Sequence, residues 1–405
     1  MKRVDEGVSE VRSSQRLLVI LCVSVGVAMV GLGIIWPLVP VYASQLGARG
    51  LELGLIIASF NIARTIAGPF SGRFSDRWGR KSFIAAGLLL YAVVSVFYVR
   101  ADDVASLVAV RLVHGMAAVM VAPVAMALVA DAAADCRLGR AMGTLSMSMM
   151  IGLGAGPMLG GVIQEHFGLA AAFYSMGGLA LLTLAGVILM VPSGRGVTCR
   201  TTARQPVRAG VKQLVGHRWL QVLVLLRVFT AAGQGCVYTF LPLLAAELNV
   251  SGTQIGLVLG TNIFLLAALQ RVCGNLADRS RPEGLLLGGT LLSGLAVLGM
   301  PLSDGFAGLL AANVVMGTGT GAAFAGGFVL AGRLGRFLGQ GAVMGITDAG
   351  WSLGMIAAPI LAGLIMDRFG MPAIFYSGGG LVVAGTGLTA MLLTFDRRSV
   401  NGGGP

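Results

Sequence analysis

Four ionisable side chains stand well inside long apolar stretches of this sequence: Arg64, Arg111, Arg227 and Asp348. A charge at the centre of a bilayer costs at least ~2.5–3.5 kcal/mol, so residues of this kind usually serve a function. Asp348 is the only acid deep in any apolar stretch. A carboxyl group in that position could bind and release a proton, and an arginine beside it would favour its ionised form.

Three of these four residues are predicted to lie at the same depth in the membrane. Asp348 lies nine residues after Gly339, and Arg64 and Arg227 each lie nine residues from an arginine at the end of their own stretch. A helix rises 1.5 Å per residue, so all three lie roughly 13 Å from helix ends on one side of the membrane.

The elements that must position these residues are membrane helices. Hydrophobic residues make up 56% of the 405 residues and charged residues only 11%, whereas a soluble chain has about 25% charged residues. The apolar runs are near the ~20 residues that span hydrocarbon as a helix, and they do not alternate as strands of a membrane barrel would. The twelve runs cover residues 17–43, 51–71, 83–99, 104–130, 141–164, 170–191, 219–246, 252–274, 284–302, 306–331, 340–366 and 372–395.

The charge distribution predicts the topology. If the N-terminus is inside, the outside loops contain only Arg49, Arg100 and Arg368, and nearly all other loop Lys and Arg residues lie inside. This positive-inside bias predicts a multi-pass protein of the bacterial inner membrane with both termini in the cytoplasm. The first apolar run is too long for the core of a signal peptide, so we expect it to be a retained spanning helix.

The net charge of +12 does not indicate nucleic-acid binding, because the basic stretch 193–218 fits a cytoplasmic linker that determines topology. The five cysteines form neither a CxxC pair nor a cluster with histidine. We therefore expect no metal site, no cofactor and no disulfide framework. Nucleophile–base pairs are also missing, so an enzyme is not predicted.

The sequence repeats itself with an offset of 202 residues. Residues 166–178, HFGLAAAFYSMGG, align with residues 368–380, RFGMPAIFYSGGG, and the same offset pairs Pro40 with Pro242 and Pro157 with Pro359. Each repeat holds six helices, an even number, so both halves have the same orientation, with a site expected between them. The predicted organisation is an N-terminal half 1–192, a linker 193–218 and a C-terminal half 219–405.

Three segments carry a family resemblance. Residues 72–81, GRFSDRWGRK, resemble the loop signature of the major facilitator superfamily, G-x-L-a-D-r-x-G-r-k, and the C-terminal half repeats it as GNLADR at 274–279. Residues 111–115, RLVHG, resemble the fourth-helix motif R-x-x-q-G of that family. Residues 152–161, GLGAGPMLGG, match the fifth-helix antiporter motif G-x-x-x-G-P-x-x-G-G. The resemblance covers essentially the whole chain and points to twelve-helix drug:proton antiporters.

The residue types in these segments lead to separate structural predictions. Gly72 and Gly79 would allow a tight turn, and Arg80 has a natural acidic partner in Asp131. The resemblance implies that Asp76, Arg80 and Asp131 form a latch for the outward-facing state; alternatively, they only set topology and cap helices. In the antiporter motif, Gly152, Gly156, Gly160 and Gly161 form a small-residue face for close helix approach, and Pro157 adds a bend.

In the superfamily fold, the second and eleventh helices meet across the halves, and the seventh and eleventh touch within one half. Asp348 could therefore pair with Arg64 or with Arg227. Asp348 is either the proton carrier, whose protonation releases its arginine, or one member of a permanent buried ion pair. The first helix lacks the acid that several relatives carry there. Arg111 could contribute, because the matching family arginine is tied to proton movement, and His114 would titrate near neutrality if it were exposed to water.

The resemblance also implies a central cavity lined by the first, fourth, seventh and tenth helices. Polar and aromatic residues available there are Trp36, Arg111, Arg227, Gln234, Tyr238 and Asn313. Aromatic and thioether side chains suit amphipathic molecules.

The sequence thus predicts an all-α membrane protein with the major facilitator fold, built from two pseudo-symmetric six-helix halves and acting as a monomer. Its predicted function is proton-coupled export of small amphipathic molecules by alternating access. A metabolite uptake or exchange carrier and a lipid-linked glycan flippase on the same fold remain alternatives. A non-transporting sensor is the least favoured, because no extramembrane segment is longer than 193–218.

Overall fold

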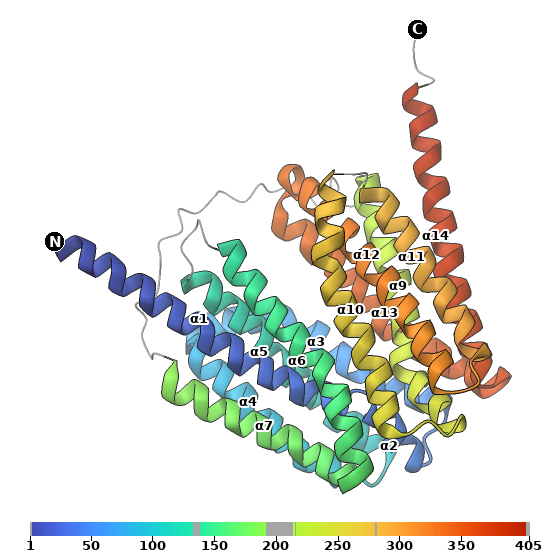
Figure 1. The fold of residues 1–405 in the computed structure, drawn as a ribbon, viewed down its shortest axis with the longest axis horizontal. Helices are drawn as coiled ribbons and strands as arrows, with labels where there is room; N and C mark the ends of the chain where they lie inside the picture. Colours follow the sequence, from blue (N-terminus) through green and yellow to red (C-terminus); the bar gives the residue numbers. More distant parts are fainter. Residues whose placement is uncertain (1, 133–137, 192–213, 215, 280–281, 402–405) are drawn as a thin grey trace. The chain divides into compact units, whose positions relative to one another are not determined.

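The computed structural model describes residues 2–132, 138–191, 214, 216–279 and 282–401. Most of the predicted linker 193–218 therefore lies outside the described residues, as do Cys136 and Cys199. All regular structure in the described residues is helical (Figure 1). The elements are α1 (Lys2–Ile35), α2 (Leu38–Gln45), α3 (Gly50–Trp78), α4 (Arg80–Val99), α5 (Val104–Ala132), α6 (Leu138–Phe167), α7 (Leu169–Met190), α9 (Arg218–Glu247), α10 (Gly252–Arg279), α11 (Pro282–Gly299), the short 3-10 helix η2 (Met300–Leu302), α12 (Phe306–Leu338), α13 (Gln340–Phe369) and α14 (Met371–Asn401).

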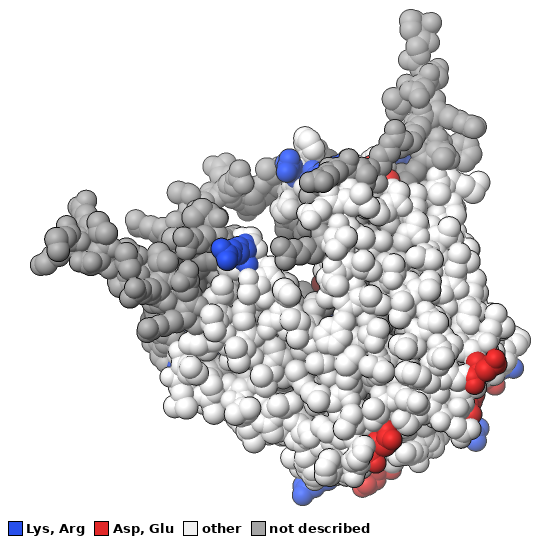
Figure 2. Space-filling model, viewed as in Figure 1, with Lys and Arg blue, Asp and Glu red and all other residues white. Residues whose placement is uncertain are grey.

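Twelve candidate membrane spans exist among the described residues, each long and apolar enough to cross a bilayer, which confirms the predicted number and type of elements. Charged side chains are sparse on the face drawn in Figure 2. The first span is broken between α1 and α2 at Pro37, because proline has no N–H for the helical hydrogen bond.

The chain divides into two compact units. The first contains Met1–Tyr42 and Ser59–Arg204, and the second contains Ala43–Ala58 and Gln205–Pro405. Helix α3 therefore contributes its first turns to the second unit and its remainder to the first. The predicted boundaries of the two halves at 192 and 219 remain a prediction.

The predicted turn at Gly72 is wrong. Helix α3 continues through Gly72 to Trp78, well beyond the predicted end at residue 71, because charged residues leave the hydrocarbon without ending the helix. The turn needs only Gly79, whose φ of +89° is in the left-handed region that favours glycine. Helix α4 begins directly after it.

In the first unit, helices α1 and α6 pack backbone to backbone through glycines. A Cβ added at Gly156 would lie 2.6 Å from the carbonyl carbon of Gly33, and one added at Gly160 would lie 2.6 Å from the carbonyl oxygen of Ile34. Gly152 likewise faces Gly26. The spacing of four residues along α6 places these glycines on one face, so α1 lies against the antiporter motif.

In the second unit, the start of α3 packs closely on α13. The backbone N–H groups of Gly50 and Leu51 donate to Asp367 Oδ1 and Oδ2 at 2.9 and 3.0 Å. A Cβ added at Gly54 would lie 2.7 Å from the carbonyl carbon of Pro359. The carboxylate caps two otherwise unpaired donors and lies at the positive end of the helix dipole.

A capping box begins α5. Ser106 N–H donates to Asp103 Oδ1 at 2.7 Å, and Asp103 N–H donates to the Ser106 hydroxyl at 3.3 Å. Hydrogen bonding to Ser106, through its side chain and then its backbone, lowers the pKa of Asp103. The cap thus holds an ionised acid at the start of the helix.

The close contact of α1 with α6 predicts a cost for any larger residue at Gly156. We expect Gly156→Val to destabilise the protein by about 1–3 kcal/mol, because the added methyl groups would meet the α1 backbone. The buried free thiols of Cys22 and Cys236 allow unfolding to be followed with a fluorogenic maleimide during heating.

Gly178→Val is the matched control. Gly178 lies on α7, is exposed, and a Cβ there meets nothing within 4 Å, so the control should unfold close to the wild-type temperature. Equal losses for both variants would contradict a specific role for glycine at the α1–α6 contact.

Candidate functional site

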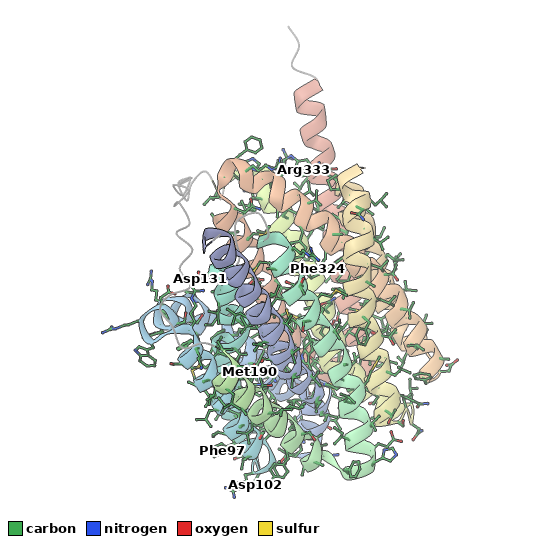
Figure 3. The ribbon with its side chains drawn as sticks, turned by 60° about the vertical axis from the view of Figure 1, so that its left-hand side comes forward. Phe97, Asp102, Asp131, Met190, Phe324 and Arg333 are labelled. Atoms are coloured by element: carbon green, nitrogen blue, oxygen red, sulfur yellow. The ribbon has the colours of Figure 1, made fainter. Side chains whose placement is uncertain are left out.

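Three charged residues of the first unit gather where α3, α4 and α5 end or begin. Arg80 Nη2 lies 2.8 Å from Asp131 Oδ2 and 3.3 Å from Asp76 Oδ1. The side chains are partly exposed, 21% for Arg80 and 38% for Asp131. Figure 3 shows Asp131 and Asp102 at opposite ends of α5. The structure thus brings the predicted latch residues together, while their role as a latch stays a prediction.

Lys81 supplies a second connection that sequence reasoning missed. Its Nζ donates to the carbonyl oxygens of Ile188 and Val191 at 2.8 and 2.5 Å. These carbonyls end α7, where a cation is favoured by the unpaired acceptors and the helix dipole. The last two residues of the loop signature therefore tie α4 to both α5 and α7.

A buried polar cluster surrounds His114 on α5. His114 is 0% exposed, and its Nδ1 lies 2.9 Å from the Tyr98 hydroxyl. The rings of Phe60, Tyr91 and Tyr98 meet the imidazole edge-on, with centroids 5.1–5.7 Å away. His114 Nε2 and the Tyr91 hydroxyl have no hydrogen-bond partner among the described residues. The condition of water exposure under which His114 would titrate near neutrality is not met.

Arg111 borders this cluster and is only 2% exposed. Its guanidinium lies 4.8 Å from the centroid of the Phe60 ring, a cation–π contact that helps hold a charge away from water. Arg64, on α3, is exposed and acts electrostatically on Tyr91. The first unit therefore presents two arginines in very different environments.

In the second unit, Arg227 lies in an aromatic cage. Its Cζ is 4.2 Å from the centroid of Phe324, 5.2 Å from that of Phe328 and 5.3 Å from that of Trp351. The rings come from α12 and α13 and also contact one another. Sequence reasoning missed Phe328 and Trp351, although Trp351 lies one turn after Asp348 on the same helix face.

Asp348 is exposed on α13 and acts electrostatically on Arg227. Within the described residues no ion pair joins the two side chains, so the expected static pair between them is not formed here. The reason is that the π faces of the cage, rather than a carboxylate, surround the guanidinium. Arg64 lies in the first unit and Asp348 in the second, so their pairing stays a prediction.

Two residues predicted to line a cavity, Tyr238 and Asn313, are joined through Asn262 in a buried hydrogen-bond network of the second unit. The Tyr238 hydroxyl donates to Asn262 Oδ1 at 3.2 Å, and Asn262 Nδ2 donates to the Asn313 carbonyl at 3.1 Å. Gln234, Tyr238 and Asn313 are at most 6% exposed. Asn262 was missed, although an asparagine within an apolar stretch signals such a network.

The remaining predicted residues lie as follows. Trp36 is half-buried at the break between α1 and α2, and Pro157 and Gly161 are buried on α6. Helix α6 runs through Pro157 without interruption. Among the residues that the structure describes, no three His, Cys, Asp or Glu side chains are placed to hold a metal ion.

The two tyrosines around His114 allow a matched comparison. Tyr98→Phe removes the hydrogen bond to His114 Nδ1 and leaves a buried polar atom unpaired, so we expect a loss of about 1–3 kcal/mol in stability. Tyr91→Phe removes a hydroxyl without a partner and should cost nothing or stabilise slightly. Thermal unfolding of both variants is the measurement, and a larger loss for Tyr91→Phe would show that the hydrogen bonding is assigned wrongly.

The Arg80–Asp131 pair predicts a coupling between two side chains. In a double-mutant cycle with Arg80→Gln and Asp131→Asn, we expect at most about 1 kcal/mol of coupling in unfolding free energy, because solvent screens partly exposed pairs. The coupling should fall as salt rises. Asp102→Asn, at the other end of α5, should be additive with Arg80→Gln. Coupling of equal size for Asp102 would exclude a specific pair.

Comparisons with known proteins agree with this architecture. The family model described as Major Facilitator Superfamily matches residues 21–234 and 223–404. The chain is 29% identical over 356 residues to the uncharacterized MFS-type transporter MJ1560 of Methanocaldococcus jannaschii, covering 86% of this chain and 90% of that protein. It is 28% identical over 238 residues to the quinolone resistance protein NorA of Staphylococcus aureus, covering 58% of this chain and 60% of NorA.

Solved structures share the fold at low sequence identity. A bacterial homolog of the human lysosomal transporter Spinster, in an inward-facing and unoccupied conformation, has a TM-score of 0.77 at 14% identity, covering 95% of this chain and 96% of that one. The nucleoside transporter NupG has a TM-score of 0.73 at 13% identity, covering 93% and 99%. With a family model matched over nearly its whole length and twelve apolar helices in its structure, the chain belongs to the major facilitator superfamily.

Proposed function

We propose that this transporter exports small amphipathic molecules by alternating access in exchange for protons. The relationship to NorA and the match of residues 152–161 to the antiporter motif support the direction and the coupling. We expect a single chain in the inner membrane with both termini in the cytoplasm, as the distribution of Lys and Arg predicts.

One observation carries the proposal: Asp348 is an exposed acid in the interior of a membrane span. It lies on α13 between Gln340 and Phe369, away from both helix ends. A carboxylate cannot face lipid at that depth without a large cost, so it must face a water-filled space. A group with access to water can exchange its proton, which a carrier requires.

The cage around Arg227 supports the proposal that Asp348 binds a proton without disrupting the fold. The rings stabilise the guanidinium of Arg227, so this arginine does not depend on a direct ion pair. Neutralising Asp348 would therefore not leave it as an uncompensated charge. The proton would instead remove the attraction between Asp348 and Arg227. An organic cation near Asp348 and Trp351 would lose the same attraction, so proton and cation would compete for one carboxylate.

Competition of this kind produces antiport. A ligand shifts a conformational equilibrium only by its difference in affinity for the two states. If the ionised form of Asp348 holds the substrate and the protonated form releases it, one half of the transport cycle carries the substrate and the other half carries the proton.

We propose that Asp76, Arg80 and Asp131 stabilise one of the two conformational states of the transporter through their contacts at the ends of α3 and α5.

The carrier role of Asp348 predicts the behaviour of its neutral variant. Asp348→Asn should reduce proton-driven export of a fluorescent lipophilic cation, such as ethidium, at least tenfold in proteoliposomes, because the amide binds no proton. Exchange of labelled for unlabelled substrate without a proton gradient should also fall, because the neutral amide, like the protonated acid, does not attract the cation. Asp348→Glu should retain part of the driven transport.

Asp304→Asn is the control, because Asp304 is also an exposed acid of the second unit but lies in the connection before α12. It should transport like the wild type. Full proton-driven transport by Asp348→Asn would end the carrier proposal, and a wild type that dissipates no proton gradient with any of a broad panel of compounds would end the antiport proposal.

Buried Arg111 and partly buried Arg227 favour a second candidate, a carrier for anionic metabolites. An anion at Arg227 would bind better when Asp348 is protonated, because the competing carboxylate is then neutral. Proton and anion would move together, as in uptake. The pH dependence of substrate binding distinguishes the exporter from the anion carrier. Lower pH should weaken the binding of a cation at this site and strengthen the binding of an anion.

A further inference from the structure

A cavity of about 440 Å³ opens at the end of α12 in the second unit. It is lined by Val329, Gly332, Arg333, Arg336 and Gln340. No acidic side chain lines it, whereas two of the five lining residues are arginines. Figure 3 shows Arg333 at the end of α12, farther along this helix than Phe324 of the aromatic cage. The cavity is therefore separate from the groups proposed for coupling.

The two arginines share one face of α12. They are three residues apart, a spacing that places side chains next to each other on a helix. Both are exposed, and neither makes an ion pair or a hydrogen bond within the described residues. Two guanidinium groups on one face repel each other, so a bound anion would relieve an unfavourable arrangement.

The start of α13 adds donors to the same place. Gly339, with φ of +98°, ends α12 and begins α13, so Gln340 is the first residue of a helix of 30 residues. The Gln340 side chain packs against Gly335, where a Cβ would lie 2.8 Å from its Cδ. The first backbone N–H groups of a helix have no intrahelical acceptor and attract anions.

The internal repeat shows that the charge here was reversed relative to the first half. With the offset of 202 residues, Arg333 corresponds to Asp131, and Pro282 corresponds to Arg80. The first half thus places an acid against an arginine at this position. The second half places an arginine there and has proline where its partner would stand. Among the described side chains Arg333 has no acidic partner like that of the first-half pair, so it is available to an external anion.

The surroundings indicate where that anion comes from. Phe337, one residue after Arg336, is 79% exposed, and the span that contains α12 ends at Leu338. An exposed aromatic ring at the end of a span belongs at the lipid interface. A cluster of arginines at this level meets the phosphate groups of the membrane.

We propose that Arg333, Arg336 and Gln340 form a binding site for the phosphate-bearing headgroup of an anionic lipid. The arginines bind the phosphate oxygens, for which the planar guanidinium is well suited. Gln340 and the first N–H groups of α13 complete the site. An anion there joins α12 to α13, the helix that carries Asp348.

The test uses the purified full-length chain in a neutral detergent, with phosphatidylglycerol and phosphatidylcholine as probes. We expect phosphatidylglycerol, but not phosphatidylcholine, to bind saturably in native mass spectrometry and to raise the unfolding temperature by several degrees. Arg333→Gln/Arg336→Gln should weaken binding of phosphatidylglycerol at least tenfold. Arg73→Gln/Arg140→Gln removes the same charge from exposed positions of the first unit and should bind like the wild type.

A second variant guards against a folding defect. Gly332→Leu keeps both arginines and fills the cavity, and a Cβ there has room, with Gln340 Nε2 3.9 Å away. It should also weaken binding tenfold or more. Equal weakening by the control pair, or unchanged binding by both cavity variants, overturns the site. If inorganic phosphate binds as tightly as phosphatidylglycerol, the occupant is a free anion and the assignment to lipid is overturned.

Discussion

Close contact between helix backbones is the interaction on which the rest of this structure depends. Lipid chains are as apolar as leucine, so helices in a bilayer associate through packing at short range rather than through the hydrophobic effect. Glycines supply that packing in both units: α6 faces α1 through Gly152, Gly156 and Gly160, and the start of α3 faces α13 through Gly54. Every polar side chain discussed above lies on or next to a helix that such contacts position.

Different surroundings stabilise the different polar side chains. Arg80, at helix ends, pairs with carboxylates where water still screens the interaction. Arg227, deeper in its span, is held by aromatic rings, and His114 is buried with a tyrosine hydroxyl on one nitrogen. Asp348 combines depth in a span with exposure, and the proposal that it exchanges a proton rests on this combination.

The two sequence repeats share a pattern of helices but differ in the ionisable residues that lie deep in the spans. With the offset of 202 residues, Asp348 corresponds to Ser146, Arg227 to Val25 and Arg111 to Asn313. The same offset pairs glycines and prolines, which shape helices and their contacts, and it also pairs Asp76 with Asp278 and Asp102 with Asp304. The ionisable residues that lie deep in the spans are the ones that differ. The repeat therefore accounts for the shared pattern of helices, and we propose that the differing deep residues determine what each half contributes to transport.

The twelve spans followed from the sequence alone, because a bilayer requires about 20 apolar residues per helix and hydropathy records that length directly. The small-residue face at Gly152, Gly156 and Gly160 was predictable from local spacing. The charged trio around Arg80 was predictable because Asp131 ends its span on the same side of the membrane as the loop signature. The aromatic cage of Arg227, the tyrosines around His114 and the Asp367 cap on α3 were not. Each joins residues from different helices, and only the tertiary packing decides which side chains meet and which, like Asp348, remain exposed.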